Sequence, residues 1–230
     1  MHARFPDGNS FAAAMLATAL LCGGLQAQAQ EQEDSSRFQG RYELWAGPVS
    51  WPGLTDLLPP AGDFDSVGLG IGLGAHFVMR SFEASDLLLG VDLSVSGVDS
   101  DIDGYFSSVM AQHFFLGASV KWLFGENRNV SLDAGFGYHE VEIADMSTVF
   151  WGIEESLWTS GRWGTWAGVT WDIGSGRPGH SGGLFVAARA HFVDFGNVRD
   201  EGPVFEPVLG SGAGKLDGPL YVLEIGYSGR

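Results

Sequence analysis

Apolar and small residues alternate with a period of two through the stretch from residue 67 to residue 79. Every odd-numbered residue from Val67 to Met79 is apolar, and glycine fills four of the positions between them. Because successive side chains of a strand point to opposite faces, this pattern predicts one apolar face and one face of nearly bare backbone. Glycine makes a poor solvent face but suits a crowded inner wall. The apolar face would then contact lipid, which indicates a transmembrane β-barrel.

Seven other segments alternate in the same way. Each has an apolar face and a face of glycine, charged and scattered bulky residues, and each is about 10 residues long, which is the span of a tilted transmembrane strand. The eight predicted strands cover residues 38–49, 67–79, 87–96, 111–124, 130–141, 162–173, 184–193 and 220–228. They predict an all-β fold, an eight-stranded antiparallel transmembrane β-barrel with up-and-down connectivity, whose narrow interior is filled by side chains.

The predicted connections alternate in length. Residues 81–86, 125–129 and 174–183 are short or medium and carry turn residues, whereas residues 50–66, 97–110, 142–161 and 194–218 are longer. Outer-membrane barrels have short periplasmic turns and longer extracellular loops. With eight strands, both ends of the barrel sequence are expected on the periplasmic side.

Aromatic residues on the apolar faces are spaced as two membrane girdles require. Trp163 and Trp171 are eight residues apart, as are Phe114 and Trp122. Eight residues of strand span about 26 Å, or roughly 20 Å of membrane depth after tilting. The alternative is that aromatic residues are simply common in strands. The predicted girdle positions are Phe77, Phe114, Trp122, Tyr138, Trp163, Trp171, Phe192, Tyr221 and Tyr227, with Phe38 joining the inner one.

The first 29 residues are typical of a secretory signal peptide. Arg4 gives a positive start, an apolar run follows, and Ala27-Gln-Ala29 is a cleavage site of the usual small-residue type. An uncleaved anchor is the alternative, although the apolar run is short for a membrane helix. We therefore expect residues 1–29 to be a signal peptide, residues 30–37 a short periplasmic lead-in, and residues 38–230 the barrel. Cys22, the single cysteine, would leave with the signal.

Composition narrows the classes of partner. Charged residues make up only 17% of the chain, and the net charge is −16. Such an acidic protein is a poor candidate for binding nucleic acid. After the signal, the sequence contains no apolar run long enough for a transmembrane helix.

From residue 38 to residue 230 the chain resembles the small eight-stranded outer-membrane barrels of the OmpA, OmpX and opacity-protein type. The resemblance rests on the glycine-alternating second strand, the eight segments, the loop asymmetry and the last strand, Leu220–Tyr227. It implies insertion by the barrel-assembly machinery, which reads a terminal aromatic residue in this family. Here Tyr227 is followed by Ser-Gly-Arg, a departure that concerns the recognition signal.

The predicted inward faces carry charges of both signs, which must be paired when buried. They are Arg41, Glu43, Asp92, Lys121, Asp133, Arg162, Asp172, Arg189 and Glu224. We expect an interior ion-pair network that plugs the barrel, with a narrow polar pore as the alternative. His76, His113, His139 and His191 share these faces. A metal or proton-sensing site near His113 and His139 is conceivable, but the spacing is no metal motif, so hydrogen-bonded wall histidines are expected, with no metal and no cofactor.

No catalytic residues are predicted. Some small barrels of this kind are lipid A deacylases or acyltransferases, and a deacylase carries a lipid-facing histidine and serine with a supporting carboxylate. Tyr138-His139-Glu140 is the nearest arrangement, but Val141 occupies the position at which a serine would be needed. The chain is therefore expected not to be an enzyme.

The long loops are acidic and aromatic. Asp99, Asp101 and Asp103 alternate ahead of Gly104, either as a weak calcium site or as a solvated turn, and the downstream ligand of a calcium loop is missing. Three aromatic residues of one loop could contact an extracellular ligand or pack within the loop: Phe150, Trp151 and Trp158. We expect a structural or surface-interaction role, among outer-membrane lipids and lipopolysaccharide. A narrow pore for small solutes is the alternative, followed by a lipid A-modifying enzyme.

Overall fold

The computed structural model of the chain describes residues 40–54, 57, 62–64, 67–102, 108–125, 127–145, 155–173, 182–198 and 214–229. The predicted signal peptide, the lead-in and Phe38 lie outside these residues. In the part of the chain that is described, no helix combines the length and apolar character needed to cross a membrane.

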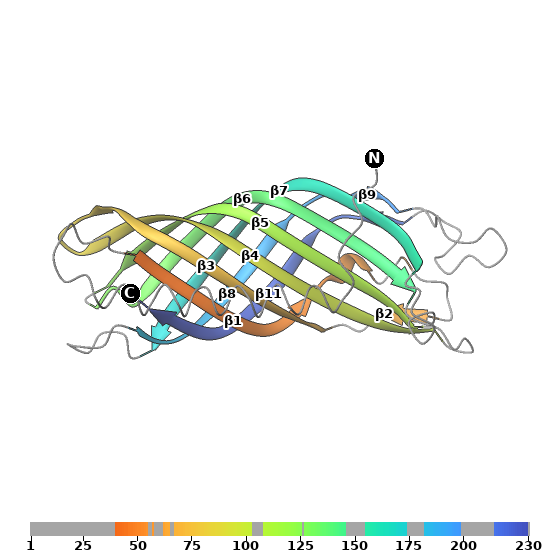
Figure 1. Cartoon of the computed structure of the whole chain (residues 1–230), viewed down its shortest axis with the longest axis horizontal. Coiled ribbons are helices and arrows are strands. Elements are labelled where there is room, and N and C mark those ends of the chain that lie inside the picture. Colours follow the sequence, from red (N-terminus) through yellow and green to blue (C-terminus); the bar gives the residue numbers. More distant parts are fainter. Residues whose placement is uncertain are drawn as a thin grey trace. The chain divides into compact units, whose positions relative to one another are not determined.

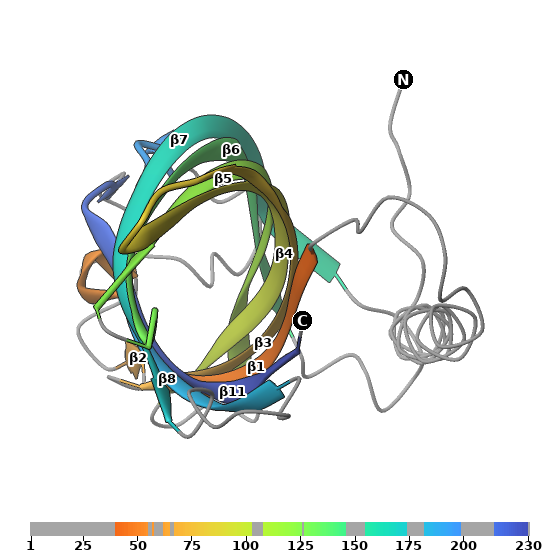
Figure 2. The ribbon, with the colours of Figure 1, turned by 90° about the vertical axis from the view of Figure 1, so that its left-hand side faces the viewer.

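Eight long strands form the wall of a closed antiparallel barrel, which confirms the predicted fold class (Figures 1 and 2). They are β1 (Gly40–Ser50), β3 (Gly68–Ser81), β4 (Ser85–Ile102), β5 (Ser108–Phe124), β6 (Val130–Asp145), β7 (Glu155–Ile173), β8 (Gly182–Phe192) and β11 (Pro219–Gly229). Each pairs with its neighbour along the chain, and β1 pairs with β11 to close the cylinder. Closure leaves no free sheet edge, as a lipid environment requires.

The two faces of the wall carry the side chains that the alternation predicts. On β3 the glycines from Gly68 to Gly74 are buried, whereas Ile71 is 42% exposed and Leu69 is 75% exposed. The same inversion holds around the barrel, with an apolar exterior and buried charges. This is the architecture of an outer-membrane barrel.

Glycine on the inner wall makes room for a large side chain of the neighbouring strand. A Cβ atom at Gly72 would lie 2.5 Å from the indole atoms Cε2 and Cζ2 of Trp45, which stands opposite on β1. Because real Cβ contacts are never that close, only glycine allows the Trp45 ring to lie against β3. Bare backbone on one strand therefore packs a bulky residue of the next.

The strands β4 to β7 run farther than the sequence predicts. The expected loops 97–110 and 142–161 are in part strand, because β4 continues to Ile102 and β6 to Asp145. From the end of the predicted strand onward the faces exchange polarity: Val141 and Ile143 are fully buried inside, while Glu142 lies on the outside. Beyond the membrane the outer face of a strand contacts water, so its outward side chains are polar and its inward ones apolar. The alternation with a period of two continues, but with the opposite polarity. For this reason these extensions were predicted as loops from the sequence.

The other two long connections contain short elements. η1 (Pro52–Leu54) follows β1, and β2 (Gly62–Phe64) pairs with the far end of β4. β9 (Gly196–Asn197) and β10 (Lys215–Leu216) form a two-stranded sheet of their own after β8. These elements lie at the barrel end opposite the short turns (Figure 1).

Candidate functional site

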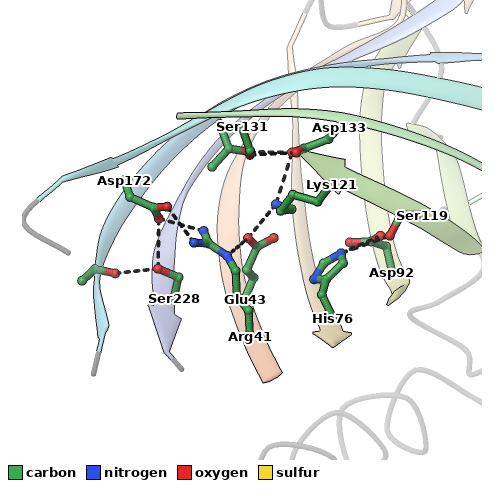
Figure 3. Close-up of polar contacts among 12 residues, drawn as sticks. Arg41, Glu43, His76, Asp92, Ser119, Lys121, Ser131, Asp133, Asp172 and Ser228 are labelled. Atoms are coloured by element: carbon green, nitrogen blue, oxygen red, sulfur yellow. Dashed lines mark hydrogen bonds and ion pairs between the residues drawn. The ribbon is translucent and has the colours of Figure 1, made fainter. Parts of the chain in front are cut away.

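The barrel interior holds a connected network of ion pairs, which begins near the short-turn end with Arg41. Its guanidinium bridges two carboxylates, with Nε 2.6 Å from Glu43 Oε1, Nη1 2.6 Å from Asp172 Oδ2 and Nη2 2.7 Å from Asp172 Oδ1. The hydroxyl of Ser228 donates to Asp172 Oδ1 at 3.0 Å (Figure 3). Ser228 and Gly229 thus continue the last strand beyond Tyr227, and Ser228 joins the network.

Glu43 connects this pair to the middle of the barrel. Lys121 Nζ lies 2.6 Å from Glu43 Oε1 and 3.2 Å from Asp133 Oδ2. Asp133 also accepts hydrogen bonds from Ser131 at 2.8 Å and from Thr170 at 2.6 Å. All of these side chains are buried, and their short contacts are of the charge-assisted kind that offsets the loss of hydration.

Arg189 and His76 complete the charged layer. Arg189 lies 3.4 Å from Glu43 Oε2, 3.5 Å from Asp92 Oδ1 and 3.2 Å from Glu224 Oε1, and its guanidinium carbon stands 4.6 Å above the ring of Trp166. His76 Nε2 lies 3.0 Å from Ser119 Oγ and 3.5 Å from Asp92 Oδ2 (Figure 3). Each basic group therefore faces more than one carboxylate.

Eight of the nine charged residues predicted for the interior lie buried in this network. Arg162 is the exception: its side chain is exposed and donates to the carbonyl oxygen of Gly161. The last β7–β8 pair joins Thr165 to Phe192, so β7 continues past the end of β8 at Arg162. Among the described residues, no neighbouring strand lies on that side of β7 at Arg162, so this side chain is exposed although it starts from the inner face.

A layer of histidine and aromatic rings lies beyond the charges. His113 Nε2 is 3.0 Å from His139 Nδ1, and the ring of His191 stands 5.4 Å from that of His139 and 6.1 Å from that of His113. Phe115 and Trp166 pack against the same rings. The structure thus brings together three of the four histidines that the sequence places on the inward faces.

An apolar cluster fills the mouth of the barrel at the long-loop end, and it was not predicted from the sequence. Trp51, Leu54 and Leu57 enter from the first long connection, and Phe195 and Leu216 from the last one. They pack with residues of the strand extensions: Val98, Val109, Ala111, Val141, Ile143, Leu157 and Trp158. The residues named in this paragraph are called the mouth cluster below. The sequence signal that could have revealed them is the presence of apolar residues within stretches otherwise typical of loops.

The residues predicted for the girdles lie on the outer face. Seven of the nine are exposed, and Phe114 and Tyr138 are half-buried. Phe77, Trp122, Trp171 and Tyr227 lie toward the short-turn end, the other five toward the long-loop end. On the outer side Trp163 stacks on Phe136 with the ring centroids 5.3 Å apart.

The sequence Tyr138-His139-Glu140, the nearest arrangement to a catalytic one, has its side chains on opposite faces of the barrel wall. His139 points inward and is fully buried, whereas Tyr138 and Glu140 lie on the outside of β6. Of the loop aromatics, Trp158 is only 7% exposed and belongs to the mouth cluster, while Phe150 and Trp151 lie outside the described residues. Asp99 is exposed on β4, and Asp103 also lies outside the described part.

Solved structures of outer-membrane proteins are similar to this chain. Ail, the attachment invasion locus protein of Yersinia pestis, is 12% identical with a TM-score of 0.41, covering 83% of this chain and 99% of its own. OprG of Pseudomonas aeruginosa is 13% identical with a TM-score of 0.44, over 84% and 97%. Neisserial surface protein A is 13% identical with a TM-score of 0.43, over 86% and 99%. No protein-family model and no curated protein matches the chain, and identities this low transfer no binding property.

Proposed function

We propose that this protein is a non-conducting outer-membrane barrel with a structural or surface-interaction role. The observation that carries the proposal is the filled interior. Three layers follow one another along the axis: the ion-pair network around Glu43, the rings around His139, and the mouth cluster. An eight-stranded barrel leaves little space for water, and these side chains occupy it.

The strand extensions supply the surface for interaction. The outer faces of β6 and β7 beyond the membrane carry polar groups such as Glu142 and Thr159. Their inner faces pack on the mouth cluster, so the platform is held rigid from within. With a net charge of −16, such a platform suits a cationic ligand, or lipopolysaccharide bridged by divalent cations.

Reaching this location requires export and assembly. The proposal includes cleavage of residues 1–29 as a signal peptide, residues 30–37 as a short lead-in, and insertion by the barrel-assembly machinery into outer-membrane lipids. The exposed apolar belt of the described strands supports a lipid environment.

Single-channel recording in planar bilayers tests the central point. The purified barrel, shown to be folded by its altered migration without heating, is expected to give no stable conductance steps. Regular steps would instead support the narrow-pore alternative. Mass spectrometry of lipid A from cells with and without the protein tests the enzymatic alternative, and unchanged acylation is the expected result.

A further inference from the structure

Three buried side chains on neighbouring strands converge inside the barrel. Glu43 on β1, His76 on β3 and Asp92 on β4 each offer a ligand atom, and these atoms all lie within 4.8 Å of one another. The three residues are at most 3% exposed. Carboxylate oxygen and imidazole nitrogen are the donors that divalent transition metals share.

The glycine at residue 74 lets these side chains lie directly against the backbone of β3. A Cβ atom there would stand 2.8 Å from Asp92 Oδ1, 2.9 Å from His76 Cε1 and 3.6 Å from Glu43 Oε2. No other glycine of the described chain has all three of these side chains as its nearest neighbours. The bare backbone at Gly74 therefore lets all three candidate ligands pack around one point of β3, where a methyl group would press against them.

The ligand atoms keep capacity for a further bond. His76 donates or accepts through Nε2 with Ser119, whereas its Nδ1 has no hydrogen-bond partner among the described residues. Fixing one ring nitrogen by a hydrogen bond is how metal-binding histidines are usually oriented. Within the described part, Asp92 Oδ2 likewise makes no hydrogen bond, and has only the long 3.5 Å contact with His76 Nε2. A buried polar atom without a partner is costly and calls for an explanation.

Glu43 is held by its neighbours mainly on one side. Arg41 and Lys121 both contact Oε1 at 2.6 Å, but within the described ranges the hydrogen-bond partner of Oε2 is Arg189, at the longer distance of 3.4 Å. Arg189 also makes a long contact with Asp92, at 3.5 Å. It would keep its contacts with Glu224 and with the face of Trp166 if a cation displaced it from Glu43 and Asp92. A cation bound to Glu43 Oε2 and Asp92 would thus displace only two long contacts.

The balance of charges in the barrel interior also favours a bound cation. Among the described residues, the network buries five carboxylates against three basic side chains, which leaves up to two surplus negative charges when the carboxylates are ionised and His76 is neutral. The carboxylates are Glu43, Asp92, Asp133, Asp172 and Glu224, and the basic groups are Arg41, Lys121 and Arg189. Uncompensated charge is expensive away from water. One divalent cation would restore neutrality.

We propose that Glu43, His76 and Asp92 bind a divalent transition metal ion inside the barrel, with Zn²⁺ as the best match to one nitrogen and two oxygen donors. Ca²⁺ and Mg²⁺ prefer all-oxygen sets, so they should bind weakly. The ion would join β1, β3 and β4 at mid-barrel. This site is independent of the proposed surface role.

Metal analysis of the folded full chain tests the site. The protein is refolded in detergent with Zn²⁺, desalted and measured for metal content, with the urea-unfolded chain as the blank. About one Zn²⁺ per folded chain is expected, and Mg²⁺ or Ca²⁺ in excess should not displace it. Asp92→Asn and His76→Gln should lower Zn²⁺ affinity by at least roughly tenfold, the loss seen even for outer-shell partners.

Two matched variants separate this site from general effects. Gly74→Ala keeps all three ligands but adds a Cβ atom that would press against Asp92 and His76, so it should also lose the metal. His191→Gln removes a buried histidine outside the trio and should retain it. A folded wild-type barrel without bound Zn²⁺ would overturn the proposal, as would equal loss in His191→Gln and His76→Gln. If the ligand variants do not fold, the wild-type unfolding temperature, read by heat-dependent migration, must still rise with Zn²⁺, and no rise would sink the idea.

Discussion

At the scale of the residue, the side of the wall decides what a position tolerates. Outward positions of β3 meet lipid, and inward positions meet the rings and charges of neighbouring strands. Neighbours such as Gly70 and Ile71 therefore obey opposite rules. Two predictions follow from this contrast, one for each face.

A charge on the lipid face should be costly. Ile71 points outward near the middle of β3, so Ile71→Arg should lose about 2–4 kcal/mol of the free energy of unfolding. The measurement is urea unfolding in lipid vesicles, followed by tryptophan fluorescence. Ile71→Ala serves as the control, since it removes the side chain without adding a charge. Normal stability of Ile71→Arg would mean that the outward assignment is wrong.

A methyl group on the inner face should be costly where a ring lies against the backbone. In Gly72→Ala the new Cβ would meet Trp45 at 2.5 Å, so a loss of about 1–3 kcal/mol is expected from overpacking. Gly97→Ala is the matched control, because its Cβ would meet nothing closer than Met110 Sδ at 3.7 Å. Equal unfolding midpoints for the two variants would contradict this packing account.

Most residue positions could be predicted from the alternation alone, since a side chain's face follows from its parity along a strand. Arg162 shows where that reasoning stops. Parity predicts an inward arginine, but whether its site is enclosed depends on where β8 ends, and Phe192 is the last paired residue there. Parity carries no information on the length of a neighbouring strand.

At the scale of the element, the polar and apolar faces of a strand are exchanged where the strand extends beyond the membrane. On β6 the buried face changes from Asp133 and His139 to Val141 and Ile143, and the outer face changes from Phe136 to Glu142. The prediction relied on alternating apolar residues that face lipid, and these stop at the membrane boundary. The sequence could therefore predict eight strands but not the full length of β4 to β7. The alternation with a period of two, which continues past the predicted strands, was the sequence signal for the extensions of β4 to β7.

Truncating the buried face of an extension should destabilise the barrel. Ile143 is fully buried in the mouth cluster, so Ile143→Ala should cost about 2–5 kcal/mol. Glu142→Ala, one residue earlier on the outer face, should change the free energy of unfolding by no more than about 0.5 kcal/mol. The two midpoints in urea provide the comparison. The reverse ranking would show that residues 142 and 143 belong to a loop.

The β9–β10 hairpin should respond to pH through its exposed charges. The hydrogen bond from Lys215 lowers the pKa of Asp194, and hydrogen bonds to Asp217 and Asp194 raise the pKa of Lys215. The carboxylate's contribution is present above the usual pKa of 3.8 and disappears as the pH falls through the lowered value. The ammonium's contribution is present below 10.5 and disappears as the pH rises through the raised one.

Amide exchange of Phe195 and Val198, which donate across this hairpin, reports its opening. After correction for intrinsic exchange rates, protection should be highest between these limits and modestly lower on either side, as exposed pairs contribute little. Lys215→Gln should remove most of the pH dependence. A dependence that survives in this variant would place its origin elsewhere.

At the scale of the whole molecule, the barrel is closed twice by different chemistry. Ion pairs around Glu43 close its middle, and the mouth cluster closes its long-loop end. The charged closure could be predicted because charges on inward faces must pair. The apolar one could not, since which connection folds back into the mouth depends on tertiary packing of Leu54 and Phe195.

Removing the apolar closure alone should weaken the barrel without opening it. The double variant Leu54→Ala with Phe195→Ala deletes two fully buried side chains, each worth about 2–5 kcal/mol. Planar-bilayer recordings should still show no stable steps, because Arg41, Lys121 and Arg189 keep their carboxylate partners deeper in the barrel. A single variant on the lipid face, Leu69→Ala, controls for general loosening. Conductance in the double variant but not in this control would show that the ion-pair layer passes ions, leaving the mouth cluster as the effective seal.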